Sequence, residues 1–351
     1  MSSTHPAPPA MRDVARLAGV HQTTVSRALR NDPRIPEATR RKIERAAARL
    51  GYQPHPLVSA LIALRRSRHP SRFPTTLAFI GWAGEPGNRY PVHQYTHKAH
   101  LEGATAAAEQ QGYHVEFFAV DSTGMTERRL NEILTTRGVP GILISSLPYG
   151  PGKFALDWNR YSTVAIEYTF TEPAFDRVVH DSYDGMRRIM TECRDRGLRR
   201  VGLALTAAGH ERTEQLNSAA FWTEQRSDGT FAEVPPLSMP AWDTAAFDEW
   251  IRTHRLQAIV TSNALLPDIS AWCEANGRTV GGDLALFNVN ADRKGPLPGI
   301  DQDPYTIGAI ATRMLIEKIL RNERGIPTRR RTLLTQGSWV DPIVRRAPAP
   351  A

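Results

Sequence analysis

The sequence has little of what a disulfide-stabilised, zinc-binding or membrane protein requires. Among 351 residues, Cys193 and Cys273 are the only cysteines, too few for a disulfide framework or a cysteine zinc site. No run of about 18 apolar residues occurs, so we expect no membrane-spanning helix. The first ten residues, MSSTHPAPPA, lack the basic and apolar parts of a secretion signal and are expected to form a disordered tail. These absences favour a cytoplasmic protein.

Sequence patterns of the common enzyme classes are missing as well. The chain has no Walker loop, no Gly-x-Gly-x-x-Gly after a strand, no nucleophile elbow and no pair of catalytic carboxylates. We therefore expect neither catalytic residues nor a cofactor, and no enzymatic activity.

Three histidines have the spacing of one helix face. His93, His97 and His100 fall at i, i+4 and i+7, so a helix through them would align three imidazole rings, and a metal site is one interpretation. The segment begins at a proline-bounded loop, and Glu102 is its only acidic partner. We favour a solvated or interface cluster and predict no metal.

Positive charge is concentrated at the amino-terminal end of the chain. Residues 1–72 hold 14 Lys and Arg against four acidic residues, whereas the rest is nearly balanced, and the whole chain carries a net charge of +8. A basic head on a near-neutral body indicates a polyanionic partner. A solvated charged surface is the alternative on charge alone.

Apolar residues in this basic segment recur at helical spacing. The pattern predicts helices over 12–18 and 22–30, and a third that begins at Pro36 and ends near Leu50. The first two are joined by a turn that contains Gly19. Three short helices joined in this way have the layout of a helix-turn-helix unit.

The second helix begins with short polar side chains and contains one long donor. Arg27 can pair bidentately with a guanine edge, and Gln22, with Thr23 beside it, can read adenine in the major groove. Thr24 and Ser26 can bind phosphate oxygens, which set the register without reading sequence. The unit therefore predicts binding to duplex DNA, and an ordinary helical bundle with a basic surface is the alternative.

Beyond a Pro-rich, basic linker over 67–74, strands and helices alternate up to a last helix over Pro304–Arg321 and a strand near Thr332–Gln336. Such βα units build parallel sheets with helices on both faces, and their number suits two sheets. The expected fold class is α/β behind a helical amino-terminal domain. The earlier strand candidates are Leu77–Trp82, His114–Val120, Gly141–Leu147, Thr163–Tyr168, Arg200–Thr206, Ala258–Ser262 and Leu284–Val289.

These features resemble the LacI/GalR family of bacterial transcription regulators. The similarity rests on DVARLAGVHQTTVSRAL (13–29) and TRRKIERAAARLGYQP (39–54), and it continues through the whole chain. It implies a helix-turn-helix domain over 11–54, a hinge helix and linker over 55–74, and an effector-binding, dimerising core over 75–346. The core would have two Rossmann-like subdomains of the periplasmic-binding-protein type I kind, an N-subdomain (about 75–180 and 303–331) and a C-subdomain (about 181–302 and 332–346).

The resemblance implies further DNA contacts outside the second helix. In the family, a helix that folds on operator DNA follows the three-helix unit, and a leucine pair from the dimer wedges into the minor groove. Leu61 matches that leucine, and Val58 lies beside it on the same face. Arg34 and Tyr52 complete the expected DNA-binding set. A plain interdomain linker is the alternative for the 57–66 segment.

Four residues depart from the family pattern. His21 stands where a serine usually caps the second helix, and Pro36 where a serine usually precedes the third. Arg30 replaces a common asparagine, and Asn290 replaces a common aspartate. The fold tolerates Pro36 at a first helical turn. The base preference near His21 and the standard sugar specificity are left open.

The resemblance also places a small effector in the cleft between the core subdomains. The matching positions carry Glu, Asn and Gln for directional hydrogen bonds, Arg for charge-assisted bonds, and Trp for stacking on the apolar face of a sugar. A polyhydroxylated ligand, a sugar or its derivative, is therefore expected. A capping or loop role is the alternative for each residue, and a core position for Trp242. The expected effector-binding residues are Trp82, Glu167, Arg212, Asn217, Trp242, Asn263, Asn290 and Gln302.

The sequence thus predicts a transcriptional regulator, with repression as its expected role. It would bind a pseudo-palindromic operator as a homodimer and respond allosterically to a carbohydrate effector. The alternative is a solute- or sugar-binding protein whose basic head does not read DNA specifically. The missing export signal argues against that alternative, and the tail RRAPAPA has no leucine heptads, which favours a dimer over a tetramer.

Overall fold

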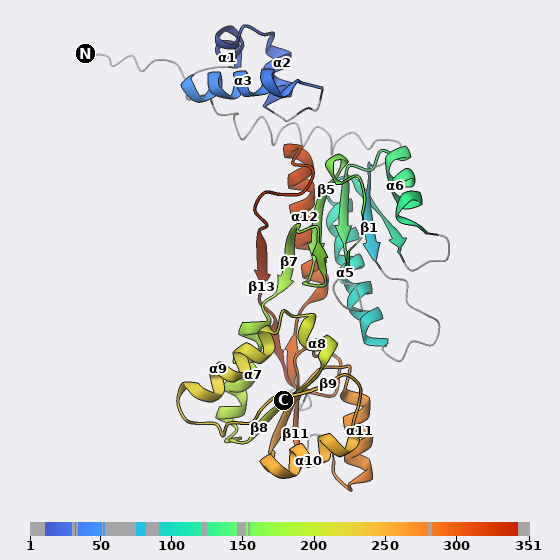
Figure 1. Ribbon diagram of the computed structural model, residues 1–351, viewed down its shortest axis with the longest axis vertical. Coiled ribbons are helices and arrows are strands. Elements are labelled where there is room, and N and C mark those ends of the chain that lie inside the picture. The colour runs from blue at the N-terminus through green and yellow to red at the C-terminus, as the bar shows by residue number, and fades with distance from the viewer. Residues whose placement is uncertain are drawn as a thin grey trace, which may run out of the picture.

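The computed structural model describes residues 11–29, 32, 34–50, 52, 75–81, 91–120, 125–145, 152–153, 155–279 and 283–342. These residues form a small helical domain and two α/β subdomains, which follow one another along the long axis of the molecule (Figure 1). The predicted α/β class with two sheets is confirmed. No helix among the described residues has the length and apolar composition that crossing a membrane requires.

The amino-terminal domain consists of α1 (Met11–Ala18), α2 (Gln22–Ala28) and α3 (Glu37–Leu50). The turn between α1 and α2 depends on Gly19, whose φ of 61° is one that residues with a side chain rarely adopt. Alanine dominates the shared core, so the three helices approach closely. The buried core residues are Val14, Ala15, Ala18, Val25, Ala28, Ile43, Ala46 and Ala47.

The N-subdomain is built on a six-stranded sheet in the order β13-β7-β5-β3-β1-β2, all parallel. Helices α5 (Pro91–Glu109) and α12 (Pro304–Arg321) cover one face, and α6 (Glu127–Thr136) and the 3₁₀ turn η1 (Trp158–Arg160) lie on the other. A two-stranded sheet pairs β4 (Gly152–Lys153) with β6 (Phe170–Glu172). The main strands are β1 (Thr75–Gly81), β2 (Tyr113–Ala119), β3 (Gly141–Ile144), β5 (Ser162–Ile166), β7 (Asp176–His180) and β13 (Thr332–Thr335).

Two glycines let α5 and α12 pack backbone to backbone. A Cβ atom on Gly103 would lie 1.9 Å from the carbonyl oxygen of Tyr305, and one on Gly308 would lie 2.1 Å from that of His100. Two non-bonded heavy atoms cannot approach so closely, so both positions require glycine. Because α12 follows the C-subdomain in sequence, this contact joins chain segments about two hundred residues apart.

The C-subdomain repeats the plan with a sheet in the order β14-β12-β11-β10-β8-β9, in which only β14 runs antiparallel to its neighbour. Helices α7 (Ser182–Asp195) and α9 (Leu216–Ser227) cover one face, and α10 (Thr244–His254) and α11 (Leu266–Ala275) cover the other. The short α8 (Ala207–Glu211) follows β8. The strands are β8 (Val201–Thr206), β9 (Leu237–Met239), β10 (Ala258–Thr261), β11 (Ala285–Asn288), β12 (Gly299–Asp301) and β14 (Ser338–Val340).

The chain passes between the subdomains three times, after β7, after β12 and between β13 and β14. The expected boundary at residue 332 is wrong for Thr332–Thr335. This strand pairs with β7, with Thr332 opposite Arg177, and so belongs to the N-subdomain sheet. It supplies the hydrogen-bonding neighbour that the buried residues of β7 would otherwise lack, and the third crossing lies at 336–337.

Candidate functional site

The second helix presents its polar residues to solvent. Gln22, Thr23 and Arg27 are exposed, whereas Val25 and Ala28 on the opposite face are buried. Thr24 and Ser26 are half-buried between these faces. Five of the residues predicted to contact DNA therefore share one short helix, with the long donor Arg27 on its outer side.

His21 caps this helix in place of the usual serine. Its Nδ1 atom accepts a hydrogen bond from the backbone N–H of Thr23 at 3.3 Å and lies 2.9 Å from the Thr23 hydroxyl. A ring nitrogen can accept in this way only when it carries no proton. The imidazole therefore performs the capping role, and it holds the Thr23 hydroxyl at the start of α2.

The remaining DNA-binding predictions fall in less regular places. Arg34 forms a bidentate ion pair with Asp32, at 2.9 and 2.7 Å, and these hydrogen bonds lower the pKa of Asp32. The Arg34 side chain nevertheless stays largely exposed. Tyr52 packs partly against the helical core, and its N–H donates to the carbonyl of Ala47. Val58 and Leu61 lie outside the described residues.

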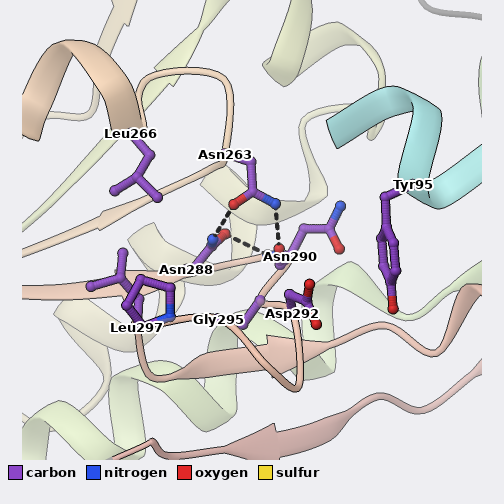
Figure 2. Close-up of a pocket in the computed structure, with 10 residues that line it drawn as sticks. Tyr95, Asn263, Leu266, Asn288, Asn290, Asp292, Gly295 and Leu297 are labelled. Atoms are coloured by element: carbon purple, nitrogen blue, oxygen red, sulfur yellow. Dashed lines mark hydrogen bonds between the residues drawn. The ribbon is translucent and has the colours of Figure 1, made fainter. Parts of the chain in front are cut away.

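The core carries a pocket of about 300 Å³ where both subdomains contribute. Most of its wall comes from the loops that follow β10 and β11 in the C-subdomain, and Tyr95 of α5 reaches it from the N-subdomain (Figure 2). The pocket thus lies at carboxyl ends of parallel strands, where ligands bind in open α/β sheets. Its lining residues are Tyr95, Asn263, Leu266, Asn288, Asn290, Ala291, Asp292, Gly295, Pro296 and Leu297.

Three asparagines form a closed ring of hydrogen bonds in this wall. The side-chain amide of Asn288 donates to the side-chain oxygen of Asn263 at 2.6 Å, and that of Asn263 donates to the carbonyl of Asn290 at 2.6 Å. The N–H of Asn290 closes the ring on the side-chain oxygen of Asn288 at 2.9 Å. Asn290 takes part only through its backbone, and its own amide extends toward Tyr95 (Figure 2).

Tyr95 faces several charged groups of the C-subdomain. Partial burial and the carboxylates of Asp292 and Asp301 raise its pKa, so the phenol keeps its proton and can donate a hydrogen bond. Arg293 pairs with Asp301 and is 3.7 Å from Asp303, whereas, within the described residues, the carboxylate of Asp292 accepts only the backbone N–H of Lys294, so the acidic side chains outnumber the arginine that pairs with them. The pocket therefore offers amides, a hydroxyl and the carboxylate of Asp292 between short apolar walls, which suits a ligand rich in hydroxyl groups.

Glu167 and Arg212 form an electrostatic pair between the two subdomains. Glu167 follows β5, and Arg212 ends α8 after β8. Burial raises the pKa of Glu167 to about 7, although the N–H of His180, at 3.4 Å, and the charges of Arg212 and Arg177 lower it. Burial likewise lowers the pKa of Arg212 to about 10, and Glu167 opposes that shift. Each group therefore stabilises the charge of the other at neutral pH.

The other expected effector residues lie away from the pocket wall. Asn217 is buried in α9, and the Gln302 amide donates to the carbonyl of Val289 at 2.9 Å, beside the second crossing. Trp242 packs on Phe247 with ring centroids 4.7 Å apart, and its N–H donates to Thr244. Trp242 is thus partly buried and packs against the core of the C-subdomain without belonging to its fully buried residues. Trp82 lies outside the described residues.

The histidines of α5 lie in different environments. His97 makes a 2.9 Å hydrogen bond with Ser145, while His100 is fully buried and burial lowers its pKa to about 3. The side chain of His93 lies outside the described residues. In the part of the chain that the structure describes, no three histidine, cysteine or acidic side chains gather as metal ligands.

Sequence reasoning missed Tyr95, Asn288 and Asp292 in the pocket wall. Asn288 sits two residues before Asn290 in the same run, LFNVN, so the strand-end argument that found Asn290 also applied to it. Asp292 follows in the next loop. Tyr95 sits on a helix of the other subdomain, and only the relative placement of the two subdomains brings it to the pocket.

Comparison with known proteins agrees with the helix-turn-helix domain and with the two-subdomain core. The family model for bacterial regulatory proteins of the lacI family matches residues 10–55, and the one for a periplasmic binding protein-like domain matches residues 190–340. The HTH-type transcriptional regulator PtxS of Pseudomonas plecoglossicida is 24% identical over 92% of this chain and 92% of its own length. The fold and the matches define a DNA-binding transcriptional regulator with a periplasmic-binding-protein-like core. Its DNA-binding domain is of the lacI family type.

Solved structures share the fold over almost the full length. A complex of the transcriptional regulator CelR with cellobiose superposes with a TM-score of 0.60 at 19% identity, covering 95% of this chain and 98% of that one. The lac repressor dimer bound to operator and the anti-inducer ONPF gives a TM-score of 0.53 at 16% identity, with the same coverage. At such identities the similarity establishes the architecture alone.

Proposed function

We propose that this regulator is a repressor that binds a pseudo-palindromic operator as a homodimer in the cytoplasm. A small carbohydrate or carbohydrate derivative in the cleft between the core subdomains would control its DNA affinity. The observation that carries the effector proposal is the asparagine ring facing Tyr95, because this wall joins both subdomains around a pocket whose amides, phenol and carboxylate can all bind hydroxyl groups. A ligand that bridges them favours one angle between the subdomains over others.

In this proposal the α2 residues have different roles in DNA recognition. Arg27 and Gln22 read base edges, Thr23 lies beside them, and Thr24 and Ser26 bind phosphates. Arg34 would exchange its ion pair with Asp32 for a phosphate, and Tyr52 would contact the backbone. The wedge role of Leu61, with Val58 beside it, belongs to the same proposal.

For the effector, Asn263 and Asn290 of the pocket wall would hold the sugar together with Tyr95, and Glu167 and Arg212 would face it from the opposite strand ends. Asn217, Gln302, Trp82 and Trp242 complete the proposed set, with Trp242 acting from the core. The cellobiose bound to CelR, a protein of the same fold, supports a carbohydrate as the first ligand to test. Relatives that regulate transcription support a role without catalysis.

The test combines operator selection with ligand screening. Duplexes enriched from a random library by the full chain should contain two inverted half-sites, and sedimentation should give two protomers per duplex. Thermal shift against a panel of mono- and disaccharides should identify the effector, and that sugar should change operator affinity. A chain that binds sugar but enriches no sequence would instead be a solute-binding protein. A chain that enriches a single, non-repeated site would overturn the dimer.

A further inference from the structure

The loop between α12 and β13, residues 322–331, carries charge that the function above does not use. Its sequence, NERGIPTRRR, has four arginines and one acidic residue. We call it the α12–β13 loop. Arg324, Arg329 and Arg330 are exposed, and the described part of the chain supplies no acidic partner for any of the three.

The loop lies on the edge of the N-subdomain to which the DNA-binding domain is attached. The strands of this sheet are parallel, so their amino ends share one edge. The loop leads into β13 at Thr332 on that edge, and β1 begins there at Thr75, directly after the linker. In Figure 1 the end of α12 that leads into the loop lies on the side nearest α1–α3.

Buried interactions hold both ends of the loop in place. The carboxylate of Asp176 is fully buried and accepts hydrogen bonds from Lys318 in the last turn of α12 at 2.7 Å, and from the N–H and side chain of Arg331 at 2.8 and 2.7 Å. Between them, the Ser162 hydroxyl donates to the carbonyl of Glu323, and the N–H of Gly325 donates to that of Tyr161. The three unpaired arginines therefore extend from a loop whose two ends are held in place.

The acidic side chains near the α12–β13 loop already form ion pairs with other cations. Glu323 pairs with Arg331 at 3.3 Å and lies 4.0 Å from Lys318, and Asp176 is enclosed by the same two cations. The loop borders a hollow of about 550 Å³, and Arg40 of α3 lines the same hollow. Positive charge of the core and of the DNA-binding domain therefore meets at this edge.

We propose that the α12–β13 loop is a second DNA contact, in which Arg324, Arg329 and Arg330 bind backbone phosphates without reading sequence. The inference rests on the proposed function, because it takes as partner the duplex that α2 binds. Guanidinium groups suit phosphate oxygens, and duplex DNA is the polyanion that attachment of the DNA-binding domain brings to this edge. Neutralising phosphates releases counterions, so the contact adds salt-sensitive affinity to every sequence alike.

The experiment compares two triple variants of the full chain. Arg324→Gln/Arg329→Gln/Arg330→Gln removes the charge of the loop. Arg199→Gln/Arg255→Gln/Arg278→Gln removes the same charge from the loops before β8, β10 and β11, at the distant edge of the C-subdomain sheet. Binding to a 40-base-pair duplex of arbitrary sequence is followed by fluorescence anisotropy at several salt concentrations. Thermal melting checks that both variants fold.

The loop variant should lower the slope of log affinity against log salt concentration by about 2–3, since each phosphate contact contributes roughly 0.9. Its affinity at low salt should fall by roughly tenfold or more, while the distant variant follows the wild-type protein. A triple Arg→Lys variant of the loop should keep most of the slope. Equal slopes for the loop and distant variants would overturn the proposal while the wild type still selects an operator. A wild type that binds no duplex would overturn both this contact and the proposed function.

Discussion

Arg177 of β7 and Glu214, which follows α8, form a 2.8 Å ion pair that links the N-subdomain to the C-subdomain. The side chain of Arg177 is 4% exposed, and its guanidinium carbon lies 4.3 Å from the ring centroid of Tyr168, whereas the side chain of Glu214 is 47% exposed. A change in the angle between the subdomains must therefore strain or break a contact with a buried cation.

Glu214→Gln should lower the free energy of unfolding by about 1–3 kcal/mol, because it removes the carboxylate that pairs directly with the buried charge of Arg177. The same change should alter effector affinity several-fold. Urea denaturation and ligand titration measure the two effects. Glu211→Gln, an exposed change three residues earlier, is the control. Equal denaturation midpoints for the two variants would show that the pair contributes nothing.

Glu167 should make stability depend on pH near neutrality. Its pKa is about 7 in the folded protein and 4.5 as a free side chain, with burial as the main cause. Between these values the folded state keeps a proton that the unfolded state has lost, so stability falls as pH rises from about 4.5 to 7. Glu167→Gln should remove this fall and stabilise the protein at pH 8 by on the order of 1–3 kcal/mol. Melting curves from pH 5 to 8 test it, with Glu249→Gln of α10 as the control. A fall that persists in Glu167→Gln contradicts the assignment.

The asparagine ring allows ligand binding to be separated from stability. Asn290→Ala removes the amide that extends toward Tyr95 but keeps the backbone bonds of the ring, so the effector's thermal shift should disappear with stability changed by less than about 0.5 kcal/mol. Asn263→Ala breaks two ring bonds and should also destabilise the protein, by roughly 1–3 kcal/mol. An undiminished thermal shift in Asn290→Ala would move the effector elsewhere.

Arg27→Ala should remove operator discrimination and leave weak, salt-sensitive binding. A bidentate contact with a base contributes about 1–3 kcal/mol of specificity, whereas phosphate contacts elsewhere persist. Anisotropy with the operator and with a scrambled duplex measures the ratio of affinities. Arg16→Ala on α1 removes the same charge from a side chain that is 80% exposed and should keep that ratio. An unchanged ratio in Arg27→Ala would mean that α2 does not read the bases.

Gly308→Ala should destabilise the N-subdomain by several kcal/mol, because the new methyl group would meet the backbone carbonyl of His100. In Gly185→Ala of α7, the nearest atom belongs to the side chain of His180, at 2.9 Å, and a side chain yields more easily. Calorimetry should therefore show the larger loss for Gly308→Ala. Similar losses would mean that α5 and α12 separate at little cost.

Local sequence patterns were sufficient where an element is bounded by its own capping residues. The predicted span Pro304–Arg321 matches α12, whose first turn is capped by the side chain of Asp303. Strand β7 was missed because its sequence, DRVVH, begins and ends with polar residues. Asp176 can nevertheless be buried, because it pairs with Lys318 and Arg331, which lie more than 140 residues away in the chain.

The same distinction applies to the site. Asn263 and Asn290 were found because each follows a short apolar strand, which is a local pattern. Tyr95 reaches the pocket from a helix of the other subdomain, and Trp242 turns inward onto Phe247. Both outcomes depend on packing between segments that no local window contains.

The three crossings have a consequence for synthesis of the chain. When the ribosome has made residue 302, the strands β8 to β12 are present and the C-subdomain lacks only β14, yet the first-made subdomain still lacks α12 and β13. The apolar face of α5 and the edge of β7 therefore stay uncovered until α12 and β13, within the last fifty residues, have been made. A nascent protein truncated there would keep a nearly whole second lobe attached to an unfinished first one, and this is where we expect chaperones to act.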